Sequence, residues 1–256
     1  MALPKVDVFG VGLSVATYNS AREEIVAAAR ERRSYAMSAL ATHGLMESVA
    51  NVHLKRLVND VDLVVPDGQP VRWAMNLLHR TGLRDRVFGP DLTGLVCEAA
   101  ASEGIGIYLF GSTPKTIALL RDRLAERYPG LRISGAQADR FREATPQEDE
   151  EDIRRINESG AGIVLVGRGC PRQERWVAEH RGKINAAMMA VGAAFDYHAG
   201  NLSRAPDWMA RNGLEWFYRL MQEPRRLFWR YFRTNSMFLW CLGTELLKKK
   251  VSRSHV

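Results

Sequence analysis

Short apolar runs alternate along the chain with segments of helical periodicity. Runs rich in branched or aromatic residues predict strands, each followed by a turn or a helix start, at 6–15, 34–42, 60–66, 106–110, 131–135, 163–166 and 188–191. Strands that alternate with helices favour a doubly wound, mostly parallel sheet, because a parallel connection needs a crossover segment. The pattern therefore predicts the α/β fold class.

Helix starts and the loss of the strand signal divide the chain. Thr145-Pro146-Gln147-Glu148 combines a capping Thr, a first-turn Pro and a Glu three residues after the cap, and Ser20 stands three residues before Glu23. After residue 206 only helices are predicted, and Pro224 is expected to begin the last one. We predict an α/β domain, residues 1–203, and a helical appendage, residues 204–256.

The expected last helix is basic and aromatic. Arg226, Arg230 and Arg233 fall at i, i+4 and i+7, so they share one face, while aromatic residues crowd the others. Such a helix lies flat on an anionic bilayer or packs on its own domain, and the pattern leaves both open. The longest late uncharged run, 234–244, is far below the roughly 20 apolar residues that a spanning helix needs.

Composition narrows the class of protein. The 256 residues are 46% hydrophobic and 25% charged, as in ordinary globular proteins, and the formal charge of +7 suggests a nucleotide, nucleic acid or acidic membrane as partner. No nucleic-acid-binding module is recognisable. The three cysteines are far apart and the histidines lack ligand spacing, so neither a disulfide framework nor a metal site is expected. With no signal-peptide layout at the start, the chain is predicted to be cytoplasmic.

Polar residues follow several predicted strands, where an open parallel sheet builds its site. Asp67 ends one strand in a Pro-Asp-Gly turn, and from spacing alone a turn Asp bonded to its own backbone is favoured over a catalytic base. Gly10-Val11-Gly12 could begin a dinucleotide fingerprint, but Val15 occupies the third position, which favours a simple turn. Asp60-Val61-Asp62 has the form of a metal-binding DxD motif, yet it lies at the amino end of its strand.

Linked motifs run in order through nearly the whole chain. They are Asp67-Gly68, Gly89-x-Asp91, the Gly111 turn, Gly167-x-Gly169-x-Pro171-x-Gln173-Glu174, Phe195-Asp196, Gly200, Arg204-Ala205-Pro206, Gly213-Leu214-Glu215-Trp216-x-x-Arg219-Leu220 and Glu223-Pro224-x-Arg226. Together they resemble the WecG/TagA/CpsF family of bacterial glycosyltransferases (glycosyltransferase family 26). The resemblance implies a Rossmann-like α/β core with a C-terminal appendage that meets the membrane and completes the active site.

The resemblance also implies an activity. It is the inverting, metal-independent transfer of a sugar from a UDP-sugar to a polyprenyl-diphosphate-linked saccharide, at the cytoplasmic face of the cell membrane. The donor would carry a hexose or N-acetylhexosamine of the glucose or N-acetylmannosamine type, and the product would be a cell-surface polysaccharide. No cofactor is expected, and a homo-oligomer is among the states left open.

The roles of individual residues follow from the resemblance and from the chemistry of transfer. Asp67 would take the proton of the acceptor hydroxyl, and Arg219, Arg226 and Arg230 would stabilise the departing diphosphate. Substrate contacts are expected from the backbone of the glycine turns at Gly68, Gly111, Gly167 and Gly169, and from Asp91, Pro171, Gln173, Glu174, Phe195, Asp196 and Arg204.

One motif departs from the family pattern. Relatives often have a Thr-x-Asn pair before the catalytic Asp, and counting back from Asp67 places Ala39 and Ala41 near those positions. Thr42 or His43 would then substitute, with a packing role for His43 about equally favoured. The sequence leaves two other function classes open: a nucleotide-cofactor oxidoreductase on a similar sheet, and a non-catalytic membrane adaptor.

Overall fold

The protein is built on one six-stranded parallel sheet. The computed structural model describes residues 3–253, except the side chains of 250, 252 and 253. The strands lie in the order β4-β3-β8-β7-β5-β6, and every neighbouring pair is parallel. Their bounds are β3 (Tyr35–Leu40), β4 (Leu63–Pro66), β5 (Ile107–Gly111), β6 (Ile133–Gln137), β7 (Ile163–Gly167) and β8 (Ala187–Ala190). The predicted α/β, Rossmann-like fold is confirmed.

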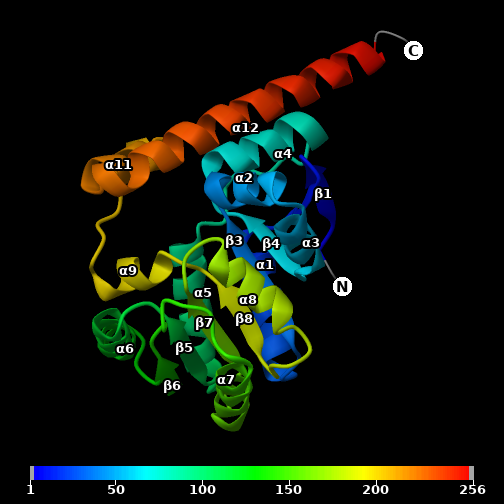
Figure 1. The fold of residues 1–256 in the computed structure, drawn as a ribbon. Coiled ribbons are helices and arrows are strands. Elements are labelled where there is room, and N and C mark those ends of the chain that lie inside the picture. Colours follow the sequence, from blue (N-terminus) through cyan, green and yellow to red (C-terminus); the bar gives the residue numbers. More distant parts are fainter. Residues whose placement is uncertain (1–2, 254–256) are drawn as a thin grey trace.

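The two faces of the sheet pack against different sets of helices (Figure 1). In β7, Val164 and Val166 point into one apolar core, while Ile163 and Leu165 point into the other. The first core is closed by α2 (Thr42–Ala50), α3 (Val52–Asp60), α4 (Gln69–His79), α7 (Pro146–Glu158) and α8 (Arg172–Glu179). The second is closed by α1 (Tyr18–Arg30), α5 (Gly89–Glu103), α6 (Pro114–Arg127) and α9 (Ala194–Ala199). Strands buried on both faces explain the continuous apolar runs of the sequence.

The first predicted strand is wrong in detail. Residues 6–15 form an antiparallel hairpin of β1 (Lys5–Val8) and β2 (Val11–Ser14), and neither strand joins the parallel sheet. Gly10 occupies the hairpin turn with φ +86°, a conformation that glycine adopts at little cost. The Gly10-Val11-Gly12 sequence therefore covers the end of the hairpin turn and the start of β2, and it does not stand at a strand-to-helix turn where a dinucleotide would bind.

Helix boundaries differ from the predictions at several points. Thr17, rather than Ser20, caps α1, and Ser20 completes the capping box at the third helical position. After β3 the chain forms two helices, separated at Asn51, whose extended backbone and side chain cap α3. The strand predicted at 188–191 is β8 (Ala187–Ala190), and α9 begins soon after it, at Ala194. The capping box of Thr145 and Glu148 at α7 is confirmed.

From residue 207 to residue 253 the chain is helical apart from short turns, as predicted. The helices are α10 (Asp207–Arg211), α11 (Glu215–Gln222) and α12 (Pro224–Arg253), and α12 crosses over α2 and α4 (Figure 1). Phe238 of α12 is 5% exposed and packs edge-on against Phe9 of the hairpin at 5.7 Å between ring centroids. The division at residue 203 stays a prediction, and residues 254–256 of the appendage lie outside the described part. Among residues 3–253, no helix combines the length and apolar character needed to cross a membrane.

Candidate active site

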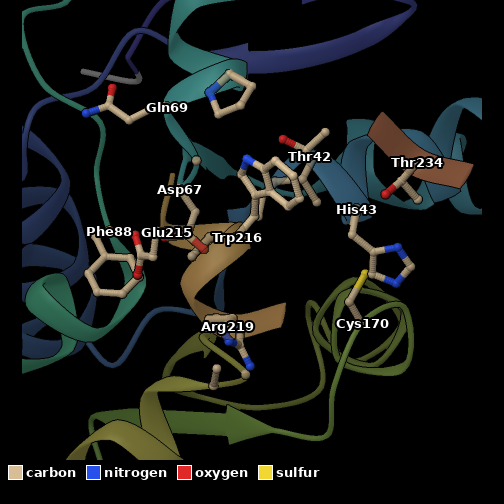
Figure 2. Close-up of a pocket in the computed structure, with 18 of the residues that line it drawn as sticks. Thr42, His43, Asp67, Gln69, Phe88, Cys170, Glu215, Trp216, Arg219 and Thr234 are labelled. Atoms are coloured by element: carbon tan, nitrogen blue, oxygen red, sulfur yellow. The ribbon is translucent and has the colours of Figure 1, made fainter. Parts of the chain in front are cut away.

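A cavity of about 710 Å³ opens at the carboxyl edge of the sheet. The residues that follow β3, β4, β7 and β8 line one side of the cavity, and residues of α11 and α12 line the other side (Figure 2). This is the edge where an open parallel sheet places a ligand site, because several strand ends and helix starts converge there. The appendage thus completes a cavity that the sheet alone would leave open.

Asp67 lies in this cavity, directly after β4. Its Oδ1 accepts a hydrogen bond from the backbone N–H of Gly89 at 2.8 Å, so its partner belongs to α5 and not to its own turn. Burial raises the pKa of Asp67 to about 6, and the positive charge of Arg86 and the Gly89 N–H limit the rise. A carboxylate with this pKa exchanges protons near neutral pH, which suits a general base.

Arg86 and Glu215 form a buried ion pair beside Asp67. Arg86 precedes α5, whereas Glu215 begins α11, and their side chains are 14% and 12% exposed. The pKa of Arg86 is raised: burial opposes the rise, while the negative charges of Glu215 and Asp67 favour it. This ion pair connects the appendage to the sheet domain next to the Asp67 carboxylate.

Three arginines of the appendage line the same cavity as Asp67: Arg219 of α11, and Arg226 and Arg230 of α12. The Nε of Arg219 is buried and has no hydrogen-bond partner. Arg226 pairs with Glu223. Within the described residues Arg230 forms no ion pair. The guanidinium groups therefore keep donors available for an anionic ligand.

The arginine face predicted for the last helix is divided by the structure. Arg226 and Arg230 line the cavity, whereas Arg233 forms an ion pair with Glu47 of α2 at 2.5 Å. Arg233 therefore fastens α12 to the sheet domain. The distinction depends on the path of α12 over α2, which the helical spacing of the arginines does not specify.

A second polar group lies at the turns after β3 and β7. Thr42, His43 and Cys170 line the cavity, and His43 lies beside Cys170 in Figure 2. Burial and the charge of Arg230 lower the pKa of His43 to about 4, so its imidazole is neutral at neutral pH. The Nδ1 atom of His43 is buried without a hydrogen-bond partner, and it lies 3.8 Å from the Glu47 carboxylate.

Gln173 and Glu174 are buried in the first turn of α8. The amide of Gln173 donates to the Glu174 carboxylate at 2.9 Å, and burial raises the pKa of Glu174 against this and other hydrogen bonds. The Oε1 of Gln173 has no partner, and Gly192 leaves room for it: a Cβ there would stand 2.9 Å from that oxygen. Both residues line the cavity, and one buried acceptor of each, the Oε1 of Gln173 and the Oε2 of Glu174, has no hydrogen-bond partner.

Other predicted site residues lie outside the cavity lining. Asp91 and Arg204 form an ion pair with each other at 2.6 Å. A Cβ at Gly111 would stand 2.6 Å from the backbone of Gly167, so this glycine lets β5 and β7 approach each other. Phe195 is 1% exposed and packs against Gly167, where a Cβ would meet its ring at 2.7 Å. Pro171 follows a cis peptide bond and does not line the cavity, whereas Gly68, Gly167, Gly169 and Asp196 do.

Sequence reasoning missed several residues of the cavity. Arg86, Trp73, Tyr197 and Tyr231 line it, and none belongs to a pattern with a chemical signature. Glu215 had a weak signal, as a carboxylate inside an otherwise basic segment that also carried the resemblance. Asp62 of the DxD sequence accepts from the Ala36 N–H at 2.9 Å and pairs with Arg181, so it is structural as predicted. Among the described residues, no group of three or more His, Cys, Asp or Glu side chains could hold a metal ion.

Comparison with known protein families assigns the chain to one of them. A family model described as "Glycosyl transferase WecG/TagA/CpsF family" matches residues 6–253, which is nearly the whole described chain. The match includes the sheet, the turn of Asp67 and all three helices of the appendage. The chain therefore belongs to the WecG/TagA/CpsF family and is a glycosyltransferase, and its family implies a role in cell-wall polysaccharide synthesis.

Proposed function

We propose that this enzyme transfers a hexose or N-acetylhexosamine from a UDP-sugar to a polyprenyl-diphosphate-linked saccharide, with inversion and without a metal ion. One observation supports the proposal above the others: Asp67 and the three arginines Arg219, Arg226 and Arg230 line a single cavity, although they come from opposite ends of the chain. The arrangement pairs one base with several cations, which is what this transfer requires.

Asp67 acts as the general base. The acceptor hydroxyl loses its proton to the Asp67 carboxylate while its oxygen attacks the anomeric carbon from the face opposite to UDP. The bond between that carbon and the UDP oxygen breaks, and the electron pair leaves with the diphosphate. A base with a pKa of about 6 is mostly ionised at neutral pH and still accepts a proton readily.

Arg219, Arg226 and Arg230 stabilise the charge that develops on the diphosphate. A guanidinium presents a planar fork that pairs with two phosphate oxygens, so it can supply positive charge and direction together. Backbone at Gly167 and Gly169 approaches the donor closely, and Gln173, Glu174 and Asp196 offer polar groups to uridine or the sugar. Thr42 and His43 occupy the positions nearest to the substituted Thr-x-Asn pair, and His43 is a neutral hydrogen-bonding group there.

The appendage holds the enzyme at the inner face of the cell membrane. Large apolar side chains stand exposed on α12, among them Trp229 at 73%, Phe232 at 62% and Trp240 at 75% exposure, beside exposed basic residues. Aromatic and basic residues on one helix favour the interface of an anionic bilayer. The lipid-linked acceptor is found at that interface.

A donor panel tests the proposal. Purified enzyme is mixed with UDP-glucose, UDP-N-acetylglucosamine or UDP-N-acetylmannosamine and a synthetic lipid-diphosphate saccharide, in buffer with excess EDTA. Mass spectrometry should detect the extended acceptor with one donor, and NMR should show the inverted anomeric configuration. Full activity of a folded Asp67→Asn protein would reject the base, and loss of transfer in EDTA that added Mg²⁺ restores would reject metal independence.

The other function classes predict different results. A membrane adaptor would bind anionic liposomes and transfer no sugar from any donor. A nucleotide-cofactor oxidoreductase would be stabilised in thermal shift by NAD(P) and not by UDP. We do not propose the latter, because the glycine pair that suggested it lies in a hairpin outside the parallel sheet.

A further inference from the structure

The active-site cavity extends into an apolar groove between α4 and α12. Six lining residues form this groove: Pro70, Trp73, Leu77, Phe238, Leu239 and Leu242. The buried face of α4 consists of Val71, Ala74, Met75 and Leu78, so Trp73 and Leu77 stand off the core. Trp73 is 38% exposed and Leu77 is 57% exposed. They are apolar residues that the fold leaves partly exposed.

Both walls of the groove change from polar to apolar in the same direction. On α12, lining residues recur every fourth position, from Arg226 and Arg230 through Thr234 to Phe238 and Leu242. Arg230 and Leu242 are separated by about 18 Å along the helix axis at ~1.5 Å per residue. On α4, the polar end is Gln69, two residues after Asp67, and the apolar end is Leu77, about 12 Å further along the helix.

The two helices are held with their apolar ends together. Lys249 of α12 donates a hydrogen bond to the carbonyl of Leu78, at the end of α4. Gly213, before α11, lies against Trp73, and a Cβ there would stand 2.6 Å from the indole ring. The groove therefore starts at the carboxylate and arginines and ends at Leu77 of α4 and Leu242 of α12.

We propose that this groove binds the hydrocarbon chain of the acceptor, an isoprenoid joined to its saccharide through a diphosphate. This rests on the proposed function and extends it. The order of chemistry along the cavity is base, cations and then apolar wall, which matches the order of saccharide, diphosphate and branched hydrocarbon in such a lipid. The first isoprene units lie against Trp73, Leu77 and Leu239, and the rest of the chain continues into the bilayer.

Binding of two isoprenoid diphosphates with the same head group tests the groove without any transfer. Farnesyl diphosphate and dimethylallyl diphosphate are titrated below the micelle concentration, in buffer without detergent, by isothermal calorimetry. Farnesyl diphosphate should bind at least about tenfold more tightly, because its longer chain removes more apolar area from water. In Leu239→Gln and Leu77→Gln proteins the ratio of the two affinities should fall to about twofold.

Leu247→Gln is the matched control. Leu247 and Leu239 both lie on α12, and they are 65% and 67% exposed, but only Leu239 lines the cavity. Leu247→Gln should keep the wild-type ratio, and circular dichroism should show all three variants folded. Equal affinity ratios in all four proteins would overturn the proposed groove. A change in the molecular mass of Leu239→Gln by light scattering, with an unchanged affinity ratio, would also overturn it and would assign the surface to a second copy of the chain.

A transfer assay separates this inference from the proposed function. With farnesyl- and dimethylallyl-linked saccharides as acceptors, the groove variants should lose the preference for the longer chain while the KM for the UDP-sugar stays unchanged. Tight, groove-dependent binding of farnesyl diphosphate with no transfer from any donor would uphold the groove and reject the proposed function. Sugar transfer that does not depend on the length of the isoprenoid or on Leu77 and Leu239 would uphold the proposed function and reject the groove.

Discussion

Arg86 and Glu215 are 129 positions apart in the chain and form a buried ion pair next to Asp67. The pair ties the first turn of α11 to the loop before α5, and Arg219, one helical turn beyond Glu215, is thereby held over the cavity. The contact therefore serves packing and chemistry together.

Replacing one partner of this ion pair should destabilise the protein more than replacing both. Glu215→Gln leaves the Arg86 charge buried without its partner, and we expect a loss of about 3 kcal/mol in the free energy of unfolding. The double variant Arg86→Gln/Glu215→Gln should recover part of that loss. Urea denaturation of the wild type, both single variants and the double variant gives the coupling energy, and additive losses would show that the two residues do not interact.

The activity should fall on the acid side of neutrality. Because the pKa of Asp67 is about 6, protonation below this pH removes the base, and kcat/KM should decline about tenfold per pH unit well below it. Arg86 lowers the pKa of Asp67, so Arg86→Gln should move the acid limb to higher pH. An acid limb that stays in place in the variant would contradict the electrostatic role of Arg86.

Asp67→Asn should lower activity and raise stability together. Loss of the base should reduce kcat by roughly 10²–10⁴-fold. The folded state raises the pKa of Asp67, so its contribution to stability is present at low pH and is lost as pH rises through about 6. Asn stays neutral at every pH. At pH near 8 the free energy of unfolding of the variant should therefore be about 2 kcal/mol higher than that of the wild type.

The stabilities should converge near pH 4, where wild-type Asp67 is protonated. Thermal denaturation at both pH values measures the difference. A variant that is less stable than the wild type at pH near 8 would show that the carboxylate is satisfied in its ionised form, contrary to the effect of burial.

Arg219→Gln should reduce kcat by roughly 10²–10³-fold, as expected when a donor to developing negative charge is removed. Arg225→Gln removes an equal charge from an exposed position outside the cavity, so it should leave the rate with a water-soluble acceptor unchanged. Steady-state kinetics on both proteins makes the comparison. Equal losses would indicate that net charge, and not the position of Arg219, determines the rate.

Gly111→Ala should act on folding more than on substrate binding. Its φ of +123° excludes ordinary side chains, and the added methyl would meet the backbone of Gly167 between two strands of the sheet. We expect a loss of about 2–4 kcal/mol in the free energy of unfolding. Gly169→Ala, whose Cβ meets no atom within 4 Å, is the control for positive φ alone. Similar losses in both would show that the contact with Gly167 is unimportant.

Local patterns in the sequence determined the elements and the edge that holds the site. Continuous apolar runs predicted β5, β7 and β8, because strands buried on both faces need apolar residues at every position. Pro224 and the Thr145 capping box predicted two helix starts, since these residues act on their own turns. Asp67 was placed at a strand end for the same local reason.

Only the tertiary structure decided which polar residues meet. Arg226 and Arg233 look alike in sequence, yet one lines the cavity and the other pairs with Glu47. Asp91 and Arg204 carried equal motif weight with Asp67 and are paired with each other instead. The pattern at the start predicted one strand where the structure has a hairpin, because alternation specifies a strand but not its partner. Ion pairs and strand pairing join residues far apart in the chain, so their formation depends on the path of the folded backbone, which no local pattern contains.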